Sequence, residues 1–366
     1  MVSSNQPFLC HFIDKIENVQ IKDPLRDILA ERSIPDKNST KRKVLILTSD
    51  YDPEANLVGI GLRNRGIDYV RLNPDDIPCQ IRVSYSIGQD FDLAVKFIIR
   101  QQLHETSGIS VVLLRNFDIE EKNFDMSEPA RTFSLQQWNN AFEILQRNLA
   151  CEWISNPQAT LQANDRAKQL SVAKAIGFDI PDTLITNDPH AARDFYHCHD
   201  GEVVIKALRH HNVVVQGKMY SMFTRRIFKK DLPRLNDLLY APCILQEQLP
   251  EKSELRVTVV GDDVFTAELD SCYTVRKYVD IHRAVSDFPI RVFKLPRKIR
   301  THCVNLIKSL GLKYGAIDFI VDDNERLVFL EVNPTGDWYW IERKTKLPIT
   351  KAMINLIEIL HKSESK

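Results

Sequence analysis

The sequence predicts a mixed fold in which an α/β unit is followed by an α+β unit. Near the start, apolar runs at 44–47 and 69–72 flank a helix-like segment over 54–65, which is a β-α-β pattern. Beyond residue 180, strand-like runs are separated by short turns such as Gly261-Asp262-Asp263. The chain has 366 residues, 43% hydrophobic and 27% charged, which fits two or three compact globular units.

The first unit is expected over residues 43–155, with a parallel sheet. Gly66 closes its first helix, and 111–114 is a further buried strand. A second helix follows, with its apolar side chains on one face: Leu135, Trp138, Phe142, Leu145 and Leu149. The unit has no glycine-rich phosphate fingerprint, so it is not expected to bind a dinucleotide.

The second unit is expected over residues 156–366, with a lid at about 180–250 and a C-terminal lobe over 251–366. Strands are predicted at 203–207, 244–248, 256–260, 264–269, 315–321 and 327–332. Helices are predicted over 164–175, 298–310 and 349–361. A basic run from Arg209 to Arg226 predicts a mobile segment over a phosphate site, with a solvated basic face as the alternative.

Composition excludes several classes of partner. Lys+Arg and Asp+Glu are both 49, so the net charge is zero. The chain therefore has no overall positive charge that would attract nucleic acid or an anionic membrane. No apolar run approaches the ~20 residues of a membrane span. The 7 cysteines include no CxxC pair. This pattern favours free thiols and a cytoplasmic protein.

Three oxygen-bearing side chains form the sharpest chemical signal. In a hairpin whose turn is centred between Asn324 and Glu325, Asp318 faces Glu331, and Asn333 lies on the same face. Two facing carboxylates repel unless a cation lies between them, and oxygen ligands suit Mg²⁺. A solvated face with an incidental acid pair is the alternative.

The hairpin sequence Gly315-Ala316-Ile317-Asp318-Phe319-Ile320, then Phe329-Leu330-Glu331-Val332-Asn333-Pro334, resembles the metal-binding hairpin of the ATP-grasp superfamily. The resemblance implies an ATP-grasp fold, with ATP and two Mg²⁺ ions as cofactors. It implies catalytic roles for Arg256, Asp318, Glu331 and Asn333, the last three as metal ligands. It implies nucleotide contacts for Lys168, Lys206, Gln246, Glu247, Leu249, Glu254 and Arg256. Lys168 is the nearest match to a helix lysine of the family, with Arg166 close by.

A narrower resemblance follows Asn333. The run Pro334-Thr335-Gly336-Asp337-Trp338-Tyr339-Trp340-Ile341-Glu342 is similar to the ending of the graspetide (microviridin-type) maturases, except that Asp337 replaces their glutamine. The segment from Ile180 to Pro189 is also similar to a sequence typical of that group. The resemblance implies macrocyclisation of a precursor peptide with a helical leader, and a homodimer as a candidate assembly. Activated Glu or Asp side chains would be attacked by Thr/Ser hydroxyls or Lys amines. Arg276, Asp280 and Arg283 are its candidate peptide contacts.

Residues 1–42 are expected to form a helical extension and linker. The run Pro7-Phe8-Leu9-Cys10-His11-Phe12-Ile13-Asp14 resembles the recognition helix of microviridin-type leaders, matching at Pro7, Phe8 and Phe12. The hypothesis is a leader-like helix joined in cis, and the alternative is a helix that covers an apolar patch. For the enzyme, the alternatives are a ligase that adds free amino acids and a degenerate ATP-grasp binding module.

Overall fold

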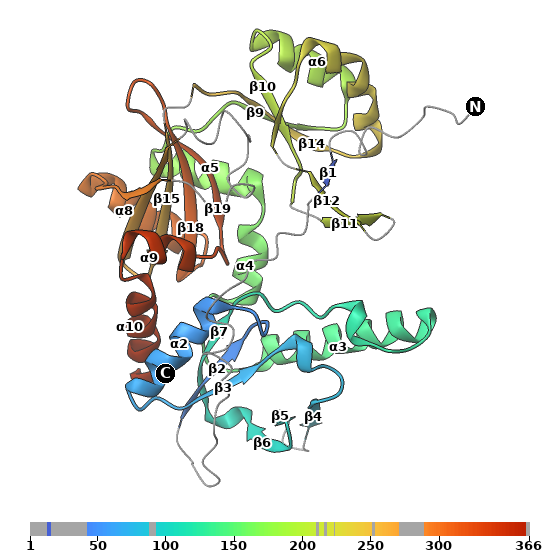
Figure 1. Cartoon of the computed structure of the whole chain (residues 1–366), viewed down its shortest axis with the longest axis vertical. Coiled ribbons are helices and arrows are strands. Elements are labelled where there is room, and N and C mark those ends of the chain that lie inside the picture. Colours follow the sequence, from blue (N-terminus) through green and yellow to red (C-terminus); the bar gives the residue numbers. More distant parts are fainter. Residues whose placement is uncertain are drawn as a thin grey trace.

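The structure is a computed structural model that describes residues 13–15, 42–87, 93–209, 212–215, 218–222, 224–250, 253–270 and 289–363. It has three lobes: a parallel-sheet unit, a central antiparallel sheet, and a smaller lobe built on β9, β10 and β14 (Figure 1). The predicted combination of α/β and α+β architecture is confirmed.

The first lobe has the expected parallel sheet, in the order β3-β2-β7-β8. Its strands are β2 (Lys43–Leu47), β3 (Tyr69–Leu72), β7 (Ile109–Leu114) and β8 (Glu152–Ile154). Helix α2 (Pro53–Asn64) joins β2 to β3. The side chain of Asp52 caps it by accepting from the Ala55 backbone N–H at 2.9 Å, and proline occupies its first position.

A three-stranded antiparallel sheet in this lobe was not predicted. It consists of β4 (Ile81–Ile87), β5 (Leu93–Ile99) and β6 (Gln102–Glu105), in that order. Only alternate β4 side chains, such as Val83 and Tyr85, pack on the core, so the strand lacks a continuous apolar run. The lobe also contains α3 (Glu128–Asn148) and the short 3₁₀ helices η1 (Pro74–Asp76), η2 (Thr106–Gly108) and η3 (Glu121–Asn123).

The central sheet has the order β17-β16-β15-β18-β19, with every described pair antiparallel. Its strands are β15 (Ser253–Val260), β16 (Asp263–Asp270), β17 (Ile290–Val292), β18 (Tyr314–Val321) and β19 (Leu327–Asn333). Helices α5 (Arg166–Ile176) and α8 (Arg297–Ser309) contribute to the core on one face, and α4 (Pro157–Ala163) precedes α5. The opposite face carries the candidate site.

The smaller lobe is a sheet of order β13-β10-β14-β9. Its strands are β9 (Thr183–Thr186), β10 (Val203–Lys206), β13 (Arg225–Arg226) and β14 (Cys243–Glu247). Helix α6 (Pro189–Cys198) and the 3₁₀ helix η4 (Lys229–Tyr240) contribute to its core. Helix α6 was not predicted.

A separate small sheet corrects the expectation for the N-terminal segment. It has the order β1-β12-β11, from β1 (Ile13–Lys15), β12 (Lys218–Met222) and β11 (Asn212–Val215). β1 pairs antiparallel with β12, Ile13 opposite Met222 and Lys15 opposite Tyr220. These three residues are therefore a strand where a helix was predicted, because the edge of β12 offers backbone partners.

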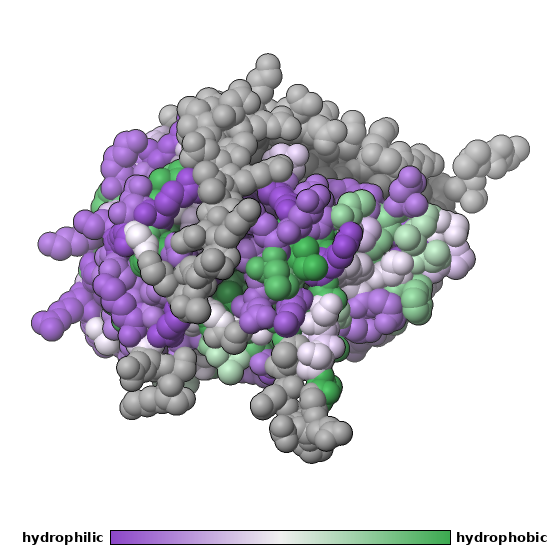
Figure 2. All heavy atoms as spheres, turned by 90° about the horizontal axis from the view of Figure 1, so that it is seen from below, coloured by the Kyte–Doolittle hydropathy of each residue, from purple (hydrophilic) through white to green (hydrophobic). Residues whose placement is uncertain are grey.

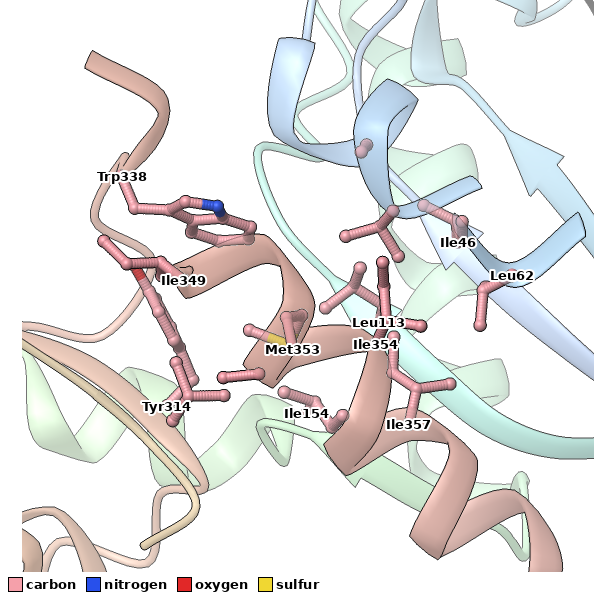
Figure 3. Packing of buried hydrophobic residues seen from close by; sticks show 14 of the residues in the cluster. Ile46, Leu62, Leu113, Ile154, Tyr314, Trp338, Ile349, Met353, Ile354 and Ile357 are labelled. Carbon is pink, nitrogen blue, oxygen red and sulfur yellow. The ribbon is translucent and has the colours of Figure 1, made fainter. Parts of the chain in front are cut away.

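The C-terminal helices join the lobes. Helix α9 (Tyr339–Thr345) is followed by α10 (Ile349–Lys362), whose Met353, Ile354 and Ile357 share a core with side chains of the first lobe (Figure 3). A Cβ at Gly61 of α2 would lie 2.1 Å from Ile354 Cδ1, so a larger residue there would force the Ile354 side chain of α10 to move. This core crosses the predicted boundary at residue 155.

The surface agrees with the balanced composition. The face in Figure 2 is mostly hydrophilic, with apolar side chains in small separate groups. Among the described residues, no helix is both long and apolar enough to span a membrane.

Candidate active site

The predicted pairing across the hairpin is confirmed. Asp318 on β18 lies opposite Glu331 on β19, and Asn333 lies opposite Ala316. The Asp318 and Glu331 side chains retain 14% and 19% of their exposed area, so a small ligand could reach them. Asn333 is half-buried, and its Oδ1 accepts from the Thr335 backbone N–H at 3.1 Å.

The hairpin is not regular beyond this pair. The register shifts between Asp318 and Phe319, and Phe319 lies opposite Phe329, so Leu330 is an extra residue in β19. A turn centred between Asn324 and Glu325 would instead give a regular ladder with Phe319 opposite Leu330. The bulge arises because the turn is one residue shorter than that ladder requires, and Glu325 adopts a left-handed φ of 61° in it. A bulge next to Glu331 alters the direction in which that carboxylate points.

Each hairpin carboxylate has its own arginine. Arg256 Nε on β15 lies 2.5 Å from Asp318 Oδ1, and a terminal guanidinium nitrogen of Arg166 lies 2.8 Å from Glu331 Oε2. Burial lowers the pKa of Arg256, but the charges of Asp318 and Glu331 outweigh burial and raise it above its usual value. Arg256 therefore stays a cation, 5.7 Å from the ring centroid of Trp340.

The structure places Lys168 away from the hairpin. Its Nζ donates to Gln162 Oε1 at 3.2 Å on an exposed side of the helix, whereas Arg166 reaches Glu331. Residues two apart on a helix do not share a face, so only one of these cations can point at the sheet. Asp165 is a residue type that commonly caps helices, and its side chain caps this one, which makes Arg166 the first helical residue.

The other predicted nucleotide contacts lie on or just after three strands, β10, β14 and β15. Lys206 ends β10, opposite Ile244, and Glu254 lies two residues before Arg256 on the same face of β15. The remaining three lie at or after the end of β14. Gln246 Nε2 donates to Thr183 Oγ1 at 2.9 Å, Glu247 Oε1 accepts from the Asp182 N–H at 3.0 Å, and Leu249 is half-buried.

Two groups of predicted residues lie outside the described residues. These are the peptide contacts Arg276, Asp280 and Arg283, and the leader-like Pro7, Phe8 and Phe12.

Sequence reasoning missed a second arginine cluster, centred on Arg115 just after β7. Arg115 Nε lies 2.8 Å from Asp52 Oδ2, and its terminal nitrogens lie 3.5 Å from Glu54 Oε2 and 2.8 Å from Asp337 Oδ1. Its guanidinium also lies 4.4 Å from the centroid of the Trp338 ring. The aspartate that departs from the graspetide pattern is thus a partner of Arg115.

This cluster fixes the loop that follows Asn333. Glu54 Oε1 accepts from the backbone N–H groups of Trp338 and Tyr339, each at 2.9 Å. The fully buried Trp338 indole donates to Thr350 Oγ1 at 3.0 Å. Burial raises the pKa of Glu54 to about 7 against the opposing charge of Arg115, with help from Asp337 and Asp52. No local sequence motif contains this cluster, because Asp52 and Glu54, Arg115, and Asp337 lie far apart in the sequence.

Comparisons with known proteins identify structures of the same fold. No family model matches the chain, and no curated protein does. The crystal structure of the macrocyclase MdnC of Microcystis aeruginosa MRC, bound with precursor peptide MdnA, superimposes with a TM-score of 0.78 at 29% identity, covering 88% of this chain and 100% of that one.

A RiPP-associated ATP-grasp ligase of Chryseobacterium gregarium, in complex with ADP and a leader and core peptide, gives a TM-score of 0.79 at 26% identity, over 87% of this chain and 97% of that one. The ATP-grasp ligase PsnB, complexed with a variant of its minimal precursor, Mg and ADP, shares the fold at 20% identity and a TM-score of 0.68, over 88% of this chain and 100% of that one. The predicted ATP-grasp fold is confirmed by these matches.

Proposed function

We propose that this chain, which is an ATP-grasp ligase with ATP and Mg²⁺ as cofactors, cyclises a ribosomal precursor peptide. One observation carries the proposal: two facing carboxylates, each paired with its own arginine, lie on the sheet of a chain whose match to a peptide macrocyclase covers that protein completely. The substrate groups would be Glu or Asp side chains and the Thr/Ser hydroxyls or Lys amines that attack them.

The residues present fit a magnesium–nucleotide complex. Asp318, Glu331 and Asn333 supply oxygen donors on one face, and oxygen donors are what Mg²⁺ requires. Bound Mg²⁺ would neutralise phosphate charge and align the transferred group. Both carboxylates are partly exposed and already hold a cation, so they can exchange that partner for the metal.

With the metal bound to the carboxylates, Arg256 and Arg166 would be free to bind the phosphate groups of ATP. A guanidinium can make the bidentate phosphate contact that an ammonium cannot, and Arg256 and Arg166 already lie beside the metal ligands. We assign Lys206 to the phosphates as well. Glu254 is proposed for the ribose hydroxyls, and the segment from Gln246 to Leu249 for the adenine edge.

The reaction needs positioned cations and no nucleophilic side chain of the enzyme. The substrate carboxylate takes the γ-phosphoryl group of ATP and releases ADP, which gives an acyl phosphate. The hydroxyl or amine attacks the acyl carbon, phosphate leaves, and the proton of the nucleophile is lost. For each ring the peptide loses the elements of one water, and one ATP becomes ADP and phosphate. Charge neutralisation by Arg256 and the metal ligands is the enzyme's main contribution.

The test is to incubate the chain with ATP, Mg²⁺ and peptides encoded beside its gene that are rich in Thr, Lys, Asp and Glu. We expect mass losses of one water per ring, dependent on ATP and lost in Asp318→Asn. A mass gain of one amino-acid residue in the presence of free amino acids would replace the proposal by a ligase of free amino acids. Unchanged peptides together with no ATP turnover would favour a degenerate binding module.

We propose further that the N-terminal segment docks in cis. Its strand β1 pairs with β12, which supports contact between this segment and the smaller lobe, and a tether raises the effective concentration of a weak ligand to the order of millimolar. Deleting residues 1–36 and adding them back as a free peptide tests this. Unchanged activity on deletion would contradict the proposal.

A cytoplasmic location and a homodimer also remain proposals. The described cysteines Cys79, Cys151, Cys198, Cys243 and Cys303 are free thiols, which supports a reducing compartment. Burial raises the pKa of Cys151 to about 12 and of Cys243 to about 11, so neither is a reactive thiolate. Light scattering on the purified chain tests the dimer.

A further inference from the structure

The hairpin strand that carries two proposed metal ligands lies at an edge of the described sheet. β19 pairs with β18 on one side, and no described strand pairs with it on the other. Its residue Val332 lies between Glu331 and Asn333 and is buried. A buried backbone group without a partner is costly, so the outward N–H and C=O of Val332 need partners from elsewhere.

One side chain supplies both partners. Gln169 on α5 is fully buried, its Nε2 donates to Val332 O at 2.8 Å, and its Oε1 accepts from the Val332 N–H at 2.9 Å. Nε2 also donates to Ala163 O at 2.5 Å, and Oε1 lies 3.3 Å from a guanidinium nitrogen of Arg166. The amide uses its full capacity of two donors and two acceptor positions. It replaces a neighbouring strand at one residue.

A second contact holds the same edge on the other side of the bulge. The Phe329 N–H donates to Asp179 O at 2.8 Å, and Asp179 follows the end of α5 closely in the sequence. The contacts at Phe329 and Val332 therefore flank Leu330 and Glu331, the bulged part of β19. The segment that supplies Arg166 to Glu331 also sets the backbone on each side of that carboxylate.

We propose that Gln169 is a positioning residue for the metal ligands Glu331 and Asn333. The inference deepens the proposed function and rests on its assignment of these ligands. Gln169 is fully buried and hydrogen-bonded to backbone groups, so the proposed role requires no contact with the nucleotide. Gln169 fixes the backbone N–H and C=O of Val332, which lies between the two ligands, and it holds Arg166 toward Glu331. Residues that orient metal ligands typically change metal affinity by about 10-fold to 100-fold when they are replaced.

Glutamine is required at this position because it both donates and accepts. Gln169→Met keeps the length and shape of the side chain but leaves the Val332 and Ala163 backbone groups without their partners. Gln169→Glu keeps the acceptor for the Val332 N–H and places a carboxylate against two carbonyl oxygens. Gln162→Met is the matched control, because Gln162 is an exposed glutamine of the preceding helix that contacts Lys168 and not β19.

The test measures binding directly. Mn²⁺ binding in the presence of ADP is followed by electron paramagnetic resonance, and ADP binding in the presence of EDTA by calorimetry. Circular dichroism and thermal melting confirm that each variant is folded. We expect Gln169→Met and Gln169→Glu to weaken Mn²⁺ binding at least 10-fold, to change metal-free ADP binding less than twofold, and to leave Gln162→Met like the wild type.

Two outcomes overturn the inference. One is a folded Gln169 variant with wild-type Mn²⁺ affinity, and the other is an equal loss of Mn²⁺ and metal-free ADP binding, which indicates a general structural role. If Gln169→Met does not fold, the same criteria apply to Gln169→Glu, and failure of both to fold also rejects the inference. Absence of ADP-dependent Mn²⁺ binding in the wild type would contradict the proposed function itself, which separates the two failures.

Discussion

The molecule contains two arginine–carboxylate clusters of similar chemistry and different burial. At the hairpin, Asp318 and Glu331 keep 14% and 19% of their side-chain exposure. Around Arg115, the Asp52 and Glu54 side chains keep 0% and 2%, and only Asp337 is exposed, at 59%. The difference lies in the carboxylates, because Arg115 and Arg256 are both buried, at 2% and 4%. The buried cluster is locked by backbone donors and by the Trp338 ring, whereas the hairpin lies on a face that a ligand can reach.

The difference in burial separates a structural role from a functional one. Removing one partner from a buried cluster leaves an uncompensated charge, so the buried carboxylates Asp52 and Glu54 cannot give up Arg115 without a large penalty. A partly exposed pair can exchange its partner for phosphate or metal. The Arg115 cluster therefore fixes the loop after Asn333, whereas the hairpin cluster is the one that we propose for binding metal and phosphate.

The largest expected effect comes from the hairpin carboxylates. Asp318→Asn and Glu331→Gln should each reduce ATP-dependent turnover by about 100-fold or more, because each removes a metal ligand and its charge. Turnover is measured as ADP release at saturating peptide. The thermal midpoints should stay within a few degrees of the wild type, and full activity of both variants at ordinary Mg²⁺ would refute the metal assignment.

Arg115→Met is expected to act on stability. It leaves Asp52, Glu54 and Asp337 without their common cation, and breaking a buried pair costs about 3–5 kcal/mol. Urea unfolding measures the loss. Arg147→Met is the control, because Arg147 forms an exposed pair with Glu143 that is worth only about 0.3–0.5 kcal/mol. Equal losses in the two variants would remove the distinction between the clusters.

Glu54 should make stability depend on pH. Its pKa rises from an ordinary 4.5 to about 7 in the folded state, so the protonated form is favoured by folding. This contribution is present at low pH and is lost as the pH rises through about 7. The free energy of unfolding should be lower at a pH above 7 than at a pH near 4.5. The expected difference is on the order of 1–3 kcal/mol. Glu54→Gln should flatten that fall, and an unchanged slope would show that another group titrates.

The smallest expected effect is on nucleotide binding, and it separates the roles of Arg166 and Lys168 on α5. Arg166→Gln should weaken Mg²⁺·ATP binding about 10-fold, which is about 1.4 kcal/mol, because Arg166 contacts Glu331. Lys168→Gln should change binding less than twofold, since Lys168 contacts Gln162. Calorimetry measures both, and the reverse order would favour Lys168 over Arg166 as the nucleotide contact.

Much of the site could be predicted because its parts are local. Asp318 and Glu331 belong to one hairpin, where alternation and the turn fix which side chains face each other. The bulge at Leu330 could not be predicted, since it depends on how the turn closes. The sequence did not show that Arg166, the first residue after the cap at Asp165, contacts Glu331, and Lys168 as a nucleotide contact stays a prediction.

The remaining features depend on contacts between distant segments. Arg115 is 222 residues from Asp337, and Gln169 is 163 residues from Val332, so no local pattern contains either interaction. The strand Ile13–Lys15 was predicted as helix because its apolar spacing is helical, yet pairing with β12 overrides that preference. Tertiary partners, and not local propensity, decide these positions.

The most direct test compares the two clusters in one binding measurement. The non-hydrolysable ATP analogue AMPPNP is titrated by calorimetry, with and without Mg²⁺, into the wild type, the double variant Asp318→Asn/Glu331→Gln and Asp337→Asn. We expect Mg²⁺-dependent binding in the wild type and in Asp337→Asn, and loss of the Mg²⁺ dependence in the double variant. Equal Mg²⁺-dependent binding by the double variant and the wild type would contradict this expectation.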